Sequence, residues 1–198
     1  MGSLQLAQTG RRRPRVATVL FVAAGVCLTA AGCGRTTEAP TLEALTPGFG
    51  VTSYATGERP SMPPIAGATL SGAQLDLANL AGSVVVLNSW ASWCAPCIEE
   101  TPELISASLS TASSDVVFVG LNVKDDPTKA RKFVEQQQIP YDSIMDPDGV
   151  LLATLPEVPP GALPSTLVID RAGQVAARII GPIPSGTLAG IVESVGAE

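Results

Sequence analysis

The chain has 198 residues, 45% of them apolar and 15% charged, which is enough to build the core of one domain plus extensions. Its formal net charge of −6 argues against a nucleic-acid partner, because such binding needs clustered Lys and Arg. The chain has no His, which excludes Ser–His and Cys–His catalysis and every zinc site that uses His. Any group that titrates near neutral pH must therefore be a cysteine or a perturbed carboxylate.

Residues 1–32 are predicted to be a signal peptide. Residues 11–15 contain four Arg, and residues 16–31 are uncharged and largely apolar, but this run is shorter than the roughly 20 residues of a spanning helix. The run ends in Ala-Ala-Gly-Cys at residues 30–33, which resembles a bacterial lipobox with Cys33 as the lipid acceptor. The protein would then be anchored to the cell membrane as a lipoprotein. The alternative is an ordinary secretory signal cleaved nearby, which would leave the protein secreted.

This cleavage divides the four cysteines. Cys27 leaves with the signal peptide and Cys33 would be acylated, so only Cys94 and Cys97 remain for chemistry. Four Arg and no acidic residue are removed, which leaves 8 basic and 18 acidic residues and a net charge of −10. We expect an acidic extracytoplasmic domain, in a compartment where disulfides persist.

Residues 33–63 are predicted to be a flexible linker, because they are rich in Thr, Pro, Gly and Ser and show little apolar periodicity. The folded domain is expected over residues 64–198. It should begin with a small β-hairpin at residues 68–77.

The next elements predict a βαβ unit, because a continuous β-branched run is typical of a strand buried on both faces. The strands are expected at residues 83–89 and 116–123, with a helix at 95–110 that Pro102 should kink. The later elements are a helix at 128–138, a strand at 144–145, a helical turn or two at 150–155, strands at 165–170 and 175–180, and a helix from about residue 185. Together they predict an α/β fold with a mixed sheet and helices on both faces.

Cys94 and Cys97 lie where the first buried strand meets the helix, in the sequence Ser-Trp-Cys-Ala-Pro-Cys at residues 92–97. Thiols at this spacing serve redox chemistry or metal binding. At a helix start, unpaired N–H groups and the helix dipole can lower a cysteine pKa from about 8.5 to roughly 3.5–7.5. We therefore assign Cys94 as the attacking nucleophile and Cys97 as the resolving cysteine. Pro96 withholds one N–H and stiffens the loop.

Two other interpretations of the cysteine pair are weaker. Zinc needs four ligands, and two cysteines without His would require carboxylates or a dimer to complete them. An inert structural disulfide across two residues closes a short loop and has little entropic benefit. We therefore expect no metal and no other cofactor.

A second motif, Leu-Pro-Ser-Thr-Leu-Val-Ile-Asp at residues 163–170, accompanies Val-Leu-Asn-Ser-Trp-Ala-Ser-Trp-Cys-Ala-Pro-Cys at residues 86–97. Together they resemble thioredoxin-like proteins, most closely the TlpA/ResA group of membrane-tethered thiol–disulfide oxidoreductases. The resemblance covers about residue 64 to the C-terminus and implies a thioredoxin-like mixed β-sheet flanked by helices, with an N-terminal β-hairpin and a central insert around residues 124–155. It further implies that Pro164 is a cis-proline beside the disulfide, which excludes metal, and that Leu163 pairs with an extended substrate segment.

Two positions depart from simple thioredoxins, in which a buried acid and a lysine form a proton relay. Asn88 replaces the acid and Gly120 replaces the lysine. Glu100, three residues after Cys97, stands where ResA-like proteins carry an active-site glutamate. We hypothesise that Glu100 tunes Cys97 or handles its proton, the alternative being a solvated helix charge.

Three further features have more modest interpretations. Trp93 is expected to cover the disulfide and shape the docking surface, whereas Trp90 is equally compatible with the core. The charges at residues 124–126, Lys-Asp-Asp, are interpreted as solvated surface.

The predicted function is dithiol–disulfide exchange between Cys94–Cys97 and cysteine-containing extracytoplasmic proteins. By the resemblance, this is a reductase in cytochrome c maturation that draws electrons from a membrane redox partner, or an oxidase that forms disulfides in secreted proteins. Glu100 mildly favours the reductase. A non-catalytic peptide-binding protein is a further alternative. A thiol peroxidase is less well supported, because Cys94 has a close resolving partner.

Overall fold

A computed structural model describes residues 50–112 and 115–198. The predicted signal peptide, Cys33 and the first part of the predicted linker lie outside the described residues. Within the described ranges, no helix is both long and apolar enough to cross a membrane.

A six-stranded mixed sheet lies at the centre of the fold, in the order β1-β8-β7-β4-β5-β6. Strands β4, β5 and β6 run parallel, whereas the β4–β7, β7–β8 and β8–β1 pairs are antiparallel. The strands are β1 Gly50–Ser53, β4 Val84–Trp90, β5 Val116–Val123, β6 Ser143–Asp146, β7 Ser165–Ile169 and β8 Val175–Ile180. The predicted α/β class with a mixed sheet is confirmed.

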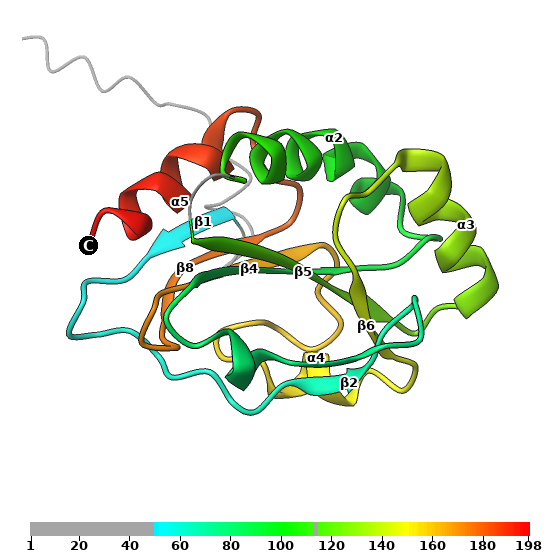
Figure 1. The fold of residues 1–198 in the computed structure, drawn as a ribbon, viewed down its shortest axis with the longest axis horizontal. Coiled ribbons are helices and arrows are strands. Elements are labelled where there is room, and N and C mark those ends of the chain that lie inside the picture. The colour runs from blue at the N-terminus through cyan, green and yellow to red at the C-terminus, as the bar shows by residue number, and fades with distance from the viewer. Residues whose placement is uncertain (1–49, 113–114) are drawn as a thin grey trace, which may run out of the picture. The chain divides into compact units, whose positions relative to one another are not determined.

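Both faces of the sheet are covered (Figure 1). On one face lie α2 (Ala95–Ser110), α3 (Pro127–Gln137) and α5 (Thr187–Gly196). On the other lie α4 (Val150–Thr154), the hairpin of β2 (Ala66–Ala68) and β3 (Gln74–Asp76), and the short 3-10 helix η1 (Leu77–Leu80). The predicted N-terminal hairpin is therefore present, and the predicted insert at residues 124–155 supplies α3, β6 and α4.

The sequence of β4 does not alternate between apolar and polar residues. All seven of its residues are buried. Val84 and Val86 pack into the cluster beneath α2 and α5, whereas Val85 and Leu87 pack into the cluster on the opposite face. A strand with apolar contacts on both faces has no reason to alternate, which confirms the prediction of a doubly buried strand.

The predicted flexible linker is wrong for its last part. Residues 50–53 form strand β1, which pairs with the free edge of β8 from Gly50↔Ile180 to Ser53↔Ala177. Arg59 follows, with Nη1 2.8 Å from the Asp170 carboxylate. The short edge strand has no periodicity of its own, because the backbone of β8 and not an apolar pattern holds it in place.

Gly120 of β5 is a glycine because two neighbours occupy the space of a side chain. A Cβ at this position would lie 2.8 Å from Trp90 Nε1 and closer still to Ser143 Oγ. Those two atoms are hydrogen-bonded to each other at 3.1 Å, so the indole crosses the strand at this point. The Trp90–Ser143 pair therefore fills the space beside Gly120.

We expect Gly120→Ala to lower the free energy of unfolding by about 2 kcal/mol, because the extra methyl group forces Trp90 and Ser143 apart. Urea denaturation measures this loss. The matched control is Gly190→Ala in α5, where an added Cβ has nothing within 4 Å. That variant should be neutral or more stable by up to about 1 kcal/mol, because alanine is the better helix former. Equal stability of the two variants would contradict the crowding at Gly120.

Candidate active site

Cys94 and Cys97 form a disulfide at the start of α2, with their Cα atoms 5.3 Å apart. Cys94 is the N-cap residue of the helix, and its Sγ accepts a hydrogen bond from the backbone N–H of Cys97 at 3.3 Å. Pro96 lies in the first turn. Cys94 therefore lies at the free N–H groups and positive dipole end of α2, where a thiolate is stabilised.

The disulfide is buried. Both sulfur atoms are used in the bond, and the cysteines are only 5% and 2% exposed. Nowhere in the described ranges do three or more Cys, Asp or Glu side chains lie close enough to hold a metal ion.

The Leu163–Pro164 peptide bond is cis. Leu163 packs against the apolar cluster that contains both cysteines, so the two motifs that are far apart in the sequence meet here. The Pro164 carbonyl accepts a hydrogen bond from Gly181 N–H at 2.9 Å, which ties it to the end of β8. Within the described residues, the backbone N–H and C=O of Leu163 take part in no hydrogen bond. This leaves a short piece of free backbone edge beside the cysteines.

Glu100 lies inside α2 and is 2% exposed, so its alternative interpretation as a solvated charge is wrong. Its Oε1 accepts a hydrogen bond from Asn88 Nδ2 at 2.8 Å, and its Oε2 accepts one from Ile183 N–H at 3.1 Å. Burial raises the pKa of Glu100 to about 7, although the two hydrogen bonds favour the charged form. Helical spacing puts this carboxyl one turn beyond Cys97 on a similar face.

Asn88 links Glu100 to the cis-proline strand. It lies in β4 and donates hydrogen bonds to Glu100 and, at 3.0 Å, to Thr166 Oγ1 in β7. Position 88 is therefore not acidic itself, but its amide donates a hydrogen bond to the carboxylate of Glu100 in α2. The sequence shows the loss of the acid at position 88, and the structure shows that Glu100 fills the space beside it.

The two tryptophans differ in burial. Trp90 is 4% exposed, packs against Phe133 with ring centroids 5.3 Å apart, and belongs to the cluster with both cysteines. Trp93, next to Cys94, is 61% exposed, and its Nε1–H donates to the Lys124 carbonyl at 3.0 Å. Trp90 is thus a core residue, whereas Trp93 lies on the surface beside the nucleophile.

The interpretation of residues 124–126 as solvated surface is wrong for Asp125 and incomplete for Asp126. Asp125 is half-buried and accepts hydrogen bonds from the backbone N–H and the hydroxyl of Ser92, 33 residues away. Asp126 caps α3 through the N–H groups of Thr128 and Lys129. An Asp before Pro127 is a recognisable helix start, but no sequence pattern points from Asp125 to Ser92.

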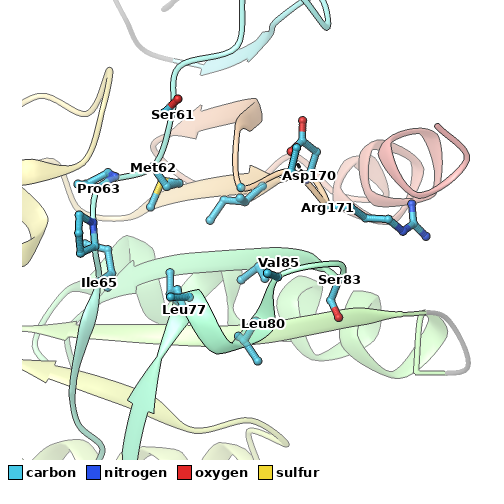
Figure 2. A pocket seen from close by; sticks show the side chains of 16 residues that line it. Ser61, Met62, Pro63, Ile65, Leu77, Leu80, Ser83, Val85, Asp170 and Arg171 are labelled. Carbon is cyan, nitrogen blue, oxygen red and sulfur yellow. Dashed lines mark hydrogen bonds between the residues drawn. The ribbon is translucent and has the colours of Figure 1, made fainter.

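A cavity of about 400 Å³ lies away from this site. It is lined by residues 61–65, η1, the start of β4 and the turn after β7, whereas Cys94 follows the other end of β4. Figure 2 shows Met62 on one side of it and Leu77 and Val85 on the other, with the Arg171 side chain pointing away. It holds no group suited to thiol chemistry.

The model of the family described as Redoxin matches residues 55–194, more than half of the chain. The chain belongs to the Redoxin family. The thiol:disulfide interchange protein HelX of Rhodobacter capsulatus is 34% identical over 102 residues, which is 52% of this chain and 54% of HelX. The thiol-disulfide oxidoreductase ResA of Bacillus cereus is 27% identical over 126 residues, 64% of this chain and 71% of ResA.

A solved structure of a thiol-disulfide isomerase is also similar to this Redoxin chain. A secreted thiol-disulfide isomerase from Corynebacterium glutamicum matches with a TM-score of 0.72 and 29% identity, over 77% of this chain and 96% of that one. The chain is therefore similar to thiol–disulfide oxidoreductases, ResA among them, which is the resemblance that its two motifs predict. The match spans only about half the length of HelX.

Glu100 should make the stability of the oxidised protein depend on pH between about 4.5 and 7. Its pKa is raised from 4.5 to about 7, so in this window the unfolded chain loses the proton that the folded chain keeps. Stability should therefore fall as pH rises through the window, by on the order of 3 kcal/mol, and level off above it. Urea denaturation of the oxidised protein at a series of pH values measures this slope.

Glu100→Gln is the control for this dependence, because it keeps the shape of the side chain and removes the titrating group. The chain has no His and its active cysteines are in the disulfide, so little else titrates in the window. A slope that persists unchanged in Glu100→Gln would show that another group is responsible.

Proposed function

We propose that this protein exchanges its Cys94–Cys97 disulfide with cysteine-containing proteins outside the cytoplasm. The observation that carries the proposal is the meeting of a disulfide at a helix N-terminus with a cis-proline segment whose Leu163 backbone is free. An extended substrate segment can pair with Leu163 as an added strand, which brings its cysteine to Cys94. Trp93 and Pro96 border the same place and complete the docking surface.

In the reducing direction, the Cys94 thiolate attacks a substrate disulfide and forms a mixed disulfide, releasing one substrate thiolate. Cys97 then loses its proton and attacks Cys94 Sγ, which releases the second substrate thiolate and restores the Cys94–Cys97 disulfide. Glu100 accepts the Cys97 proton, since a carboxyl with a pKa of about 7 is poised for this transfer. Thiols and protons balance, and the two electrons pass to the substrate.

We favour the reducing direction on electrostatic grounds. A buried carboxylate one turn from the cysteine pair opposes the stabilisation of the Cys94 thiolate by the helix N-terminus, which makes the dithiol form less stable relative to the disulfide. A dithiol that is less stable gives up its electrons more readily and has a lower reduction potential. The names of HelX and ResA, an interchange protein and an oxidoreductase, are consistent with exchange but leave its direction open.

A place in cytochrome c maturation fits this direction. Haem attachment needs apocytochrome cysteines in the reduced state, and a membrane redox partner would return electrons to Cys94–Cys97. The competing function is a disulfide-forming oxidase of secreted proteins, which requires a much higher reduction potential.

The exchange activity has a direct test. Cys94→Ser should abolish reduction of a disulfide-bearing protein by the dithiol form, whereas Cys97→Ala should trap mixed disulfides that a non-reducing gel resolves. Equilibration with dithiothreitol or glutathione buffers should place the couple nearer thioredoxin, roughly −270 mV, than DsbA, roughly −120 mV. A value near −120 mV would favour the oxidase. If the natural protein reduces no disulfide and Cys94→Ser binds peptides as well as it does, only the non-catalytic peptide-binding function is left.

We also propose that Cys33 carries the lipid that tethers the domain to the membrane. In cells fed a labelled fatty acid, the natural protein should take up label and sediment with membranes, and Cys33→Ser should do neither. Cys27→Ser, which changes a cysteine within the predicted signal peptide, is the matched control and should be labelled normally. Labelling that survives in Cys33→Ser would exclude this residue as the acceptor.

A further inference from the structure

We propose that Asp125 is a positioning residue that holds the loop in front of Cys94 in its docking arrangement, and thereby controls reaction with peptide partners. This role rests on the exchange activity proposed above. It concerns a residue outside the two cysteine and cis-proline motifs, contributed by the insert.

The Asp125 carboxylate is shared between two segments of the chain. Its Oδ2 accepts hydrogen bonds from Ser92 N–H at 2.6 Å and from Asn122 Nδ2 at 3.0 Å. Its Oδ1 accepts from the Ser92 hydroxyl at 2.8 Å and from Asp126 N–H at 2.8 Å. Hydrogen bonds to a charged acceptor are the stronger kind, so Ser92 is firmly held through two of them.

A second contact joins the neighbouring residues Lys124 and Trp93. The Lys124 carbonyl accepts the indole N–H of Trp93 at 3.0 Å. Lys124 has a left-handed backbone with φ of 49°, and its side chain packs over Gly149, where an added Cβ would lie 2.6 Å from Lys124 Cε. Residues 124–125 therefore bind residues 92–93 in register, and Cys94 is the next residue along the chain.

This arrangement matters most for Trp93. The side chain is 61% exposed, so packing alone does not fix it, and its one hydrogen bond runs to the segment that Asp125 anchors. A fixed, exposed indole beside the nucleophile can form one wall of a peptide site. A small thiol needs no such wall. Loss of the Asp125 contacts should therefore slow the reaction with peptides but leave the reaction with small thiols unchanged.

Trp93 itself reports on this loop. The chain has two tryptophans, and Trp90 is 4% exposed, so an aqueous quencher such as acrylamide reports mainly on Trp93. We expect Asp125→Ala to steepen the quenching slope and shift the emission to the red. Asp126→Ala removes the cap of α3 from the same loop without touching residues 92–93, and should leave the slope unchanged.

The kinetic test compares two reductants of the oxidised protein: dithiothreitol and a synthetic extended peptide with two reduced cysteines. In Asp125→Ala, the rate constant with the peptide should fall by about ten-fold through lost positioning, while that with dithiothreitol stays within about two-fold. Asp125→Asn loses two of the four acceptor contacts and should give an intermediate value, which covers the case in which Asp125→Ala folds poorly. Asp126→Ala should match the natural protein with both reductants.

The outcomes separate this role from the exchange activity itself. Equal slowing with peptide and dithiothreitol, or unchanged quenching in both Asp125 variants, would overturn the positioning role. The same changes in Asp126→Ala would also overturn it, because they would reflect general loosening of the loop. If the natural protein reacts with neither reductant, the exchange activity fails, and the quenching comparison still decides whether Asp125 holds Trp93.

Discussion

A buried carboxylate is the constraint on which the rest of this site depends. Glu100 lies in α2, yet its two oxygens are held by Asn88 in β4 and by the backbone before α5. Such a group can be buried only if its hydrogen bonds are satisfied, so these three elements must keep their mutual positions. The same burial raises its pKa to about 7, the property on which its proposed role as proton acceptor rests.

The cysteine loop is held on both sides by parts of the chain that are distant in sequence. On one side, Leu163 packs into the cluster that contains both cysteines. On the other, Asp125 holds Ser92 and the Lys124 carbonyl holds Trp93. Cys94 thus lies between the Leu163 segment and the loop of residues 124–125. This arrangement gives the central insert a role beyond adding α3 and β6 to the fold.

Local patterns were sufficient for much of the fold. The unbroken apolar run of β4 predicts burial on both faces, and Pro127 after an Asp predicts the start of α3. Strand β1 could not be predicted, because the hydrogen bonds that stabilise it belong to the edge of β8. The contacts of Asp125 could not be predicted for a related reason: its partner Ser92 is 33 residues away, and a charged triplet in a loop has the same sequence whether it is solvated or hydrogen-bonded.

By itself, the sequence determined the chemistry. Two cysteines at a helix start, no His and a proline at a strand entrance favour thiol–disulfide exchange, the function proposed above, over metal binding. Only the tertiary structure decided whether Glu100 is buried or solvated, because a position three residues after Cys97 on the helix is compatible with either. Burial depends on what packs against the helix from elsewhere, and here Asn88 and the backbone of Ile183 enclose Glu100.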